Sequence, residues 1–210
     1  MAFADILVLL ILIFDFGISI WDAYASGYNI GMLRKQQNTS GFTVAAAWSG
    51  VGLAFAGITY VLLVVLSYVG AYLGYIDPAT ATAVLGFDSL VFGLMIIGFG
   101  LMITIQSIII AAKTKNIWSI VIAAINTIFE VLNIIVYVET FQQSVQMVKG
   151  IAGNRKDEQN FAILVILAIV IGYFITQAAY NRGIKKAEDT NIQSIGSQQG
   201  KKGLDLKSKH

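Results

Sequence analysis

The sequence has no cysteine, one proline and one histidine. The lack of cysteine excludes thiol catalysis, iron–sulfur clusters and disulfide bonds. The histidine, His210, is the last residue, so we expect no histidine-ligated haem or zinc and, more generally, no cofactor. Phosphate-binding loops, nucleophile elbows and HExxH-type metal motifs are absent as well, so we do not expect an enzyme.

Charged residues are also scarce. They make up 12% of the chain, whereas soluble domains carry about 25%. Hydrophobic residues account for 57%, and the mean hydropathy is +0.74. The first apolar run lacks the basic residues that open a signal peptide and is too long for one, so we expect it to be retained. This composition predicts an integral membrane protein. With a net charge of only +2, we expect no nucleic-acid partner.

Five segments are long and apolar enough to cross a bilayer, which takes about 20 helical residues. We therefore predict an all-α, polytopic protein of the cell membrane, in which residues 1–186 form a five-helix transmembrane bundle. The polar residues 187–210 are rich in Gly, Ser, Gln and Lys, and we expect them to form a disordered cytoplasmic tail. The predicted spans are residues 5–27, 42–75, 79–112, 117–139 and 160–181.

The second and third spans are longer than a bilayer requires but too short to hold two spans each. We predict two single long helices joined by a tight turn, in which Asp77 caps the third span and Pro78 takes its first position. Residues 140–152 are expected to continue the fourth helix at the outer surface. Candidate caps of the second span are Asn38, Thr39 and Ser40, and those of the fourth are Thr114 and Asn116.

Basic residues set the expected orientation. Eleven of the 14 Lys and Arg residues follow the first, third and fifth spans, and only Lys149, Arg155 and Lys156 lie at the other end. Because Lys and Arg gather on the cytoplasmic side of membrane proteins, we predict that the N-terminus is outside and the C-terminus is cytoplasmic.

Polar residues in the first and fourth spans recur every three or four positions, which places them on one face of each helix. Such a face avoids lipid by meeting another helix or water. In the first span the face consists of Asp15, Ser19, Asp22, Ser26 and Asn29, and in the fourth of Ser119, Ala123, Asn126, Glu130, Asn133 and Tyr137.

The second and third spans carry faces of small residues, the usual means of close helix approach in lipid. Their glycines exceed what one hairpin needs, so we expect some of them to meet a second copy of the chain in a homo-oligomer. The small faces are Ala45, Ser49, Gly52, Ala56 and Thr59 in the second span, and Gly86, Ser89, Gly93, Gly100, Thr104 and Ser107 in the third.

Three carboxyl groups, those of Asp15, Asp88 and Glu130, fall deep inside the predicted spans. A charged Asp at the bilayer centre costs about 2.5–3.5 kcal/mol on insertion scales, and such residues usually mark ion or proton paths. No Lys or Arg occurs in residues 36–112 or 116–148. These acids must therefore be protonated, bind a cation, face water or meet a base on another subunit.

The depths of these acids can be compared from the 1.5 Å rise per helical residue. We expect the three carboxyl groups in one layer, with Asp15 facing Glu130 or a cavity that both share. Asp22 lies nearer the cytoplasmic end of its span, where we expect it to be solvated or paired with Arg34 or Lys35.

These patterns predict a cation- or proton-conducting transporter or channel, because carboxylates, amides and hydroxyls suit protons and hard cations. The alternative is a non-catalytic subunit of a larger membrane complex, whose acids meet bases on a partner. Ion movement by the purified protein alone in liposomes discriminates between the two. The candidate path residues are Asp15, Ser19, Asp22, Asp88, Asn126, Glu130 and Asn133.

Overall fold

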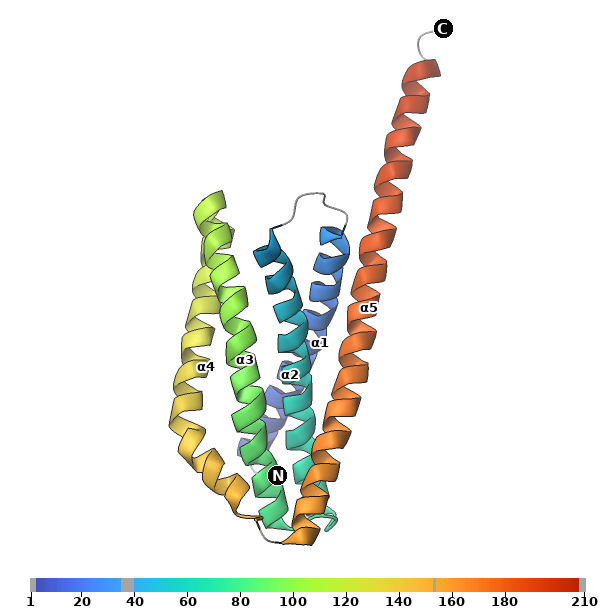
Figure 1. Ribbon diagram of the computed structural model, residues 1–210. Helices are drawn as coiled ribbons and strands as arrows, with labels where there is room; N and C mark the ends of the chain where they lie inside the picture. The colour runs from blue at the N-terminus through green and yellow to red at the C-terminus, as the bar shows by residue number, and fades with distance from the viewer. Residues whose placement is uncertain (1–2, 35–39, 153, 208–210) are drawn as a thin grey trace.

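The computed structural model describes residues 3–34, 40–152 and 154–207, with side chains described for residues 9–34, 40–152 and 154–189. The protein is all-helical, and its five helices are long and apolar enough to span a membrane, as predicted. The chain begins at one end of the bundle and finishes at the other (Figure 1). The helices are α1 (Phe3–Leu33), α2 (Gly41–Tyr72), α3 (Pro78–Thr114), α4 (Ile117–Lys149) and α5 (Arg155–Lys207).

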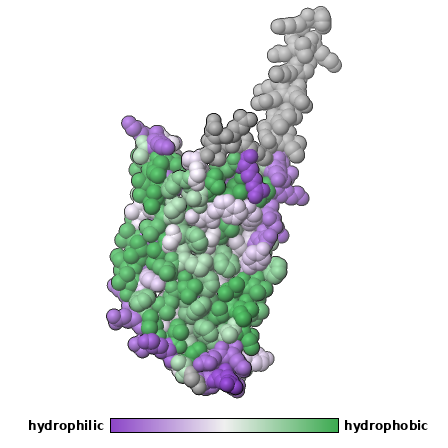
Figure 2. Space-filling model, viewed as in Figure 1, coloured by the Kyte–Doolittle hydropathy of each residue, from purple (hydrophilic) through white to green (hydrophobic). Residues whose placement is uncertain are grey.

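The surface of the bundle has the zones that a membrane imposes. On the face shown in Figure 2, apolar side chains cover a wide middle zone, and hydrophilic ones gather at its two ends. Exposed large apolar residues occur on all five helices, from Phe14 in α1 to Phe174 in α5. An apolar surface of this extent is unusual for a soluble monomer and fits contact with lipid.

The predicted hairpin of two long helices is confirmed. α2 is unbroken and packs against α3, and the turn between them ends at Asp77, whose carboxylate accepts a 2.8 Å hydrogen bond from the Thr80 backbone N–H. Pro78 follows as the first residue of α3, where its missing N–H is harmless.

Two further predicted caps are present. Ser40 accepts a hydrogen bond from the Thr43 N–H and starts α2, and Asn116 accepts one from the Trp118 N–H and starts α4. Asn38 and Thr39, the other candidates for α2, lie outside the described residues.

The helices pack in the order α4–α3–α2–α1–α5, with α5 also touching α2 and α3. α2 is therefore central, and half of its most apolar stretch is buried, against 11% of that of α4. The main apolar cluster joins α2, α3 and α5. It consists of Ala56, Leu63, Val84, Phe92, Val165 and Ala168.

Two helices extend beyond their predicted spans. α4 continues to Lys149, as expected for residues 140–152, and curves toward its end in Figure 1. α5 begins at Arg155, and its helix runs on past the other helices to Lys207. The disorder expected for residues 187–210 stays a prediction, because side chains are described only as far as Asp189.

The small residues predicted as packing faces meet helices of the same chain. Gly52 of the predicted α2 face meets the Phe99 ring of α3, and Gly86, Gly93 and Gly100 of the predicted α3 face meet α4. Gly50 and Gly57, which lie outside the predicted α2 face, meet α1. The glycines therefore no longer argue for a second copy of the chain. The homo-oligomer stays a prediction without that support.

Candidate functional site

Asp88 lies inside the main apolar cluster. It is one helical turn from Val84 on one side and from Phe92 on the other, and both are core members of that cluster. Its side chain is only 1% exposed. A carboxyl group has thus been placed where the surrounding helices otherwise bury aliphatic and aromatic side chains.

Neither carboxyl oxygen of Asp88 has a hydrogen-bond partner among the described residues. Two buried hydroxyls of α2, those of Thr59 and Ser67, likewise have no hydrogen-bond partner among the described residues. Unsatisfied buried polar groups are rare in native proteins and costly, so each calls for an explanation such as a bound ion, water or a functional role.

These three groups lie at neighbouring heights. Gly52 of α2 contacts the Phe99 ring of α3, and counting eleven residues along each antiparallel helix places Asp88 opposite Leu63. Thr59 and Ser67 lie four residues to either side of Leu63, which is about 6 Å along the helix axis. Thr59 and Ser67 therefore lie about one helical turn to either side of the height of Asp88, and the Thr59 hydroxyl lies against Gly172 of α5.

On α1 the polar face divides into two parts. Ser19 and Ser26 are buried, and their hydroxyls lie against Gly57 and Gly50 of α2. The other three residues of the polar face lie outside this contact with α2. Asp22 is half-buried, and Asp15 and Asn29 are exposed. Only the serines therefore fill the seam between α1 and α2.

Tyr60 of α2 lies close enough to both Asp15 and Asp88 to be affected by their charges. Its phenol lies in the electrostatic field of both carboxyl groups and is itself half-buried on α2. The contact of Ser19 with Gly57 places Asp15 opposite Val61, close to the height of Leu63 and hence of Asp88. The count therefore places these two acids within about 3 Å of one another along the helix axis, as the predicted common layer requires.

Glu130 is buried against α3, with 5% of its surface exposed. Its Oε2 occupies the space beside Gly100, and its Oε1 has no hydrogen-bond partner among the described residues. One turn away, the Thr104 hydroxyl donates a 3.5 Å hydrogen bond to the Asn126 carbonyl. Asn133, by contrast, is exposed. The polar face of α4 therefore meets α3 through Glu130, through the Asn126 carbonyl and through Tyr137, whose hydroxyl donates a 3.2 Å hydrogen bond to the Leu90 carbonyl.

Two predictions about Glu130 are wrong. It does not share the layer of Asp88, because Gly100 lies twelve residues from Asp88 on α3, or about 18 Å. It does not face Asp15, because α1 and α4 make no contact within the described residues. The error in depth arose at the end of the fourth span, which was placed at residue 139, whereas α4 continues to Lys149.

The acids instead fall into two layers. Asp15 and Asp88 form the first, near the height of Leu63. Asp22 lies opposite Ala54 by the same count along α1 and α2, and Glu130 lies beside Gly100, which is opposite Val51. Asp22 and Glu130 therefore form a second layer, roughly 15 Å closer to the C-terminal end of α1.

Among the described residues, no ion pair between a basic side chain and Asp88 or Glu130 is present. The α2, α3 and α4 sequences carry Lys or Arg only near their ends, at Lys113 and Lys149. Within the described residues, no three His, Asp or Glu side chains come close enough to share a metal ion. Within the described residues, the site thus consists of isolated oxygen groups without a shared metal-binding cluster.

Sequence reasoning missed three residues that belong to this region. Thr59 was assigned to a packing face, and Ser67 and Tyr60 were not singled out. A period of four residues does connect Thr59, Leu63 and Ser67, and it is the signal that places both hydroxyls near one face of α2.

Comparisons with protein-family models, with curated proteins and with solved structures found no match to this chain.

Proposed function

We propose that this protein is a proton- or cation-conducting membrane transporter or channel with Asp88 as its central ionisable group. The observation that carries the proposal is the burial of the Asp88 carboxyl group among apolar side chains with both oxygens unpartnered. An ionised carboxylate there would lack compensation, so the neutral acid is the form that this packing accommodates. Loss of its proton requires water or a cation to enter the bundle.

The arrangement of the other acids supports a stepwise path. Asp15, Tyr60 and Asp88 lie in one layer, and Asp22 and Glu130 lie in the next. Each layer supplies groups that can accept or release a proton. The unpartnered hydroxyls of Thr59 and Ser67 provide further hydrogen-bonding positions within about one helical turn of the height of Asp88.

The orientation is part of the proposal. Arg34, Lys113 and Lys115 lie at the end of the bundle from which α5 projects, so the positive-inside rule assigns that end to the cytoplasm. The five apolar helices support a multi-pass membrane protein, and we propose the cell membrane as its location. Protease access to the C-terminal segment in right-side-out vesicles tests this: digestion from outside would reverse the assignment.

The transport proposal is tested with purified protein in proteoliposomes that contain a pH-sensitive dye. We expect a proton or cation gradient to dissipate faster with protein than without it. Asp88→Asn should remove most of this flux, because an amide has nearly the same shape but neither releases a proton nor balances a cation. The matched control is Glu139→Gln, an exposed acid of α4, which should keep the flux. Equal flux in wild type and Asp88→Asn would contradict the proposal.

A second candidate is a subunit of a larger membrane complex, and the exposure of Asp15 favours it. Its neighbours Ile11, Phe14 and Ile18 are also exposed, so the carboxyl group lies on an apolar surface. A basic or amide side chain of a partner would compensate it there. Purification in mild detergent tests this candidate: a stable partner that is lost in Asp15→Leu, together with no flux by the protein alone, favours assembly over transport.

A further inference from the structure

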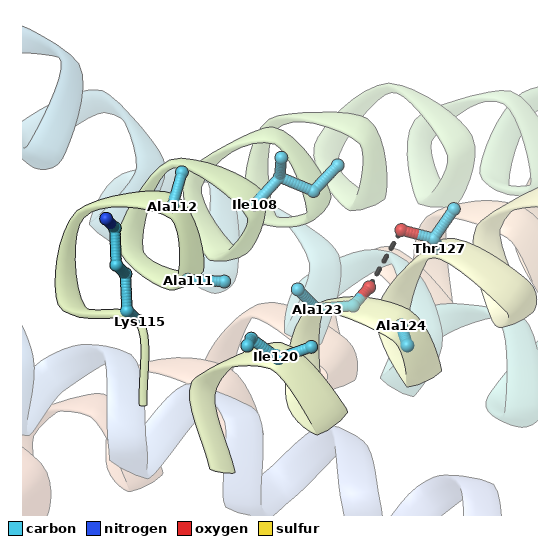
Figure 3. Close-up of a pocket in the computed structure, with 8 residues that line it drawn as sticks. All are labelled: Ile108, Ala111, Ala112, Lys115, Ile120, Ala123, Ala124 and Thr127. Carbon is cyan, nitrogen blue, oxygen red and sulfur yellow. Dashed lines mark hydrogen bonds between the residues drawn. The ribbon is translucent and has the colours of Figure 1, made fainter. Parts of the chain in front are cut away.

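A hollow opens between α3 and α4 at their connected ends. Its volume is about 710 Å³, and its lining is apolar except for Lys115 and Thr127. The Thr127 hydroxyl donates a 2.7 Å hydrogen bond to the Ala123 carbonyl, so it offers no free donor to a ligand (Figure 3). The lining residues are Ile108, Ala111, Ala112, Lys115, Ile120, Ala123, Ala124 and Thr127.

The hollow exists because small residues face each other there. Four of the lining residues are alanines, Ala111 and Ala112 on α3 and Ala123 and Ala124 on α4, and Ala111 and Ala123 point toward each other (Figure 3). Nearer the middle of α3 and α4, Gly100 and Glu130 bring these two helices into direct contact. α3 and α4 are therefore in contact near their middle and are separated by the hollow at their connected ends.

The mouth of the hollow carries uncompensated positive charge. Lys115 is in the left-handed conformation, with φ of 51°, and ends α3, and Lys113 lies in the last turn of that helix. Neither lysine forms an ion pair within the part of the chain that the structure describes, and the sequence has no acid between Asp88 and Glu130. The exposed indole of Trp118 lies close by in the first turn of α4. Lysine and tryptophan are typical of the level of lipid headgroups.

We propose that this hollow binds one acyl chain of an anionic phospholipid, whose headgroup phosphate meets Lys115 and Lys113. The hollow is apolar and opens between two membrane-spanning helices, so its position brings it into contact with lipid. The charged mouth then favours an anionic headgroup over a zwitterionic one, because basic residues near a membrane surface attract anionic lipids. The site is independent of the proposed proton path, which lies deeper in the bundle.

The test uses the fluorescence of Trp118 in vesicles. Trp21→Phe and Trp48→Phe leave Trp118 as the only tryptophan, since the chain has three. Vesicles of phosphatidylcholine then receive equal fractions of brominated phosphatidylglycerol or brominated phosphatidylcholine. We expect stronger quenching by the anionic lipid, and a roughly fivefold loss of that preference for each lysine removed.

Three variants locate the effect. Lys113→Gln and Lys115→Asn remove the charges, and Asn tolerates the left-handed conformation at the second position. Ala124→Phe fills the hollow from an exposed position and should also reduce the preference with both lysines present. Lys149→Gln, at the opposite end of the bundle, should leave it unchanged. Equal quenching by both lipids in the parent protein would overturn the proposal. So would quenching that is weak with both lipids and rises on dilution, since a second copy of the chain would then fill the hollow.

Discussion

The Glu130 carboxyl group lies in the space that a Cβ atom on Gly100 would occupy. Gly100→Ala should therefore displace this carboxyl group and lower the thermal stability of the purified protein, by about 1–3 kcal/mol if the site behaves as an overpacked core. Gly98→Ala is the matched control, because a Cβ there meets nothing within 4 Å. Combining Gly100→Ala with Glu130→Ala should restore part of the loss, whereas simple addition of the two effects would argue against the contact.

A second prediction concerns the crossing of α1 and α5. A Cβ on Gly27 would meet the Tyr180 backbone, and a Cβ on Gly183 would meet the Tyr24 and Tyr28 backbones. Backbone atoms cannot yield as flexible side chains do, so Gly27→Leu and Gly183→Leu should each prevent normal packing of α1 on α5. Size-exclusion profiles and melting temperatures in detergent measure this. Gly17→Leu should behave like wild type, because a Cβ at that position would meet nothing within 4 Å.

Much of the fold could be predicted because apolar length and cap residues act locally. The five helices, the Asp77–Pro78 turn and the caps at Ser40 and Asn116 all follow from short stretches of sequence. Which helices touch depends on pairing across the whole bundle, and no short pattern reports it. The sequence therefore indicated polar faces on α1 and α4 but not that α2 and α3 separate them.

The candidate site was predictable only in part for the same reason. Asp88 and Glu130 stand out because acids are rare in apolar spans, and both are buried. Asp15 stands out equally in sequence, yet it is exposed. Its position beside the α1–α2 seam depends on the serines Ser19 and Ser26, which fit the glycines of α2 more closely than a carboxylate would.

A third prediction concerns pH and two acids outside the apolar spans. The backbone N–H of Thr80, together with a hydrogen bond from the Asp157 carboxyl, lowers the pKa of Asp77 to about 2. That hydrogen bond raises the pKa of Asp157, which lies in the polar first turn of α5. Asp157 therefore stabilises the contact while protonated and loses this effect as the pH rises through its raised pKa. Asp77 stabilises it while ionised and loses this effect as the pH falls toward about 2.

The contact between the α2–α3 turn and α5 should thus be strongest in mildly acidic solution, and weaker at neutral pH, where two carboxylates repel. Asp157→Asn keeps a hydrogen-bond donor but no longer titrates, so its melting temperature should change less between pH 4 and pH 7 than that of wild type. Glu139→Gln serves as the control for a lost surface acid. Parallel pH profiles of wild type and Asp157→Asn would contradict the pairing.

The last prediction separates a functional Asp88 from a structural one. Leu has the same branching as Asp and suits the apolar cluster, so Asp88→Leu removes two unpartnered buried oxygens without leaving a cavity. An unsatisfied buried polar group costs about 1–3 kcal/mol, and the variant should therefore melt at a higher temperature than wild type. Flux in proteoliposomes should disappear at the same time, because no titratable group remains at this position. A protein that carries a destabilising acid for its activity shows this opposition between stability and function. If Asp88 instead held the bundle together through hydrogen bonds, Asp88→Leu would lower the melting temperature, and the proposed path would lose its central residue.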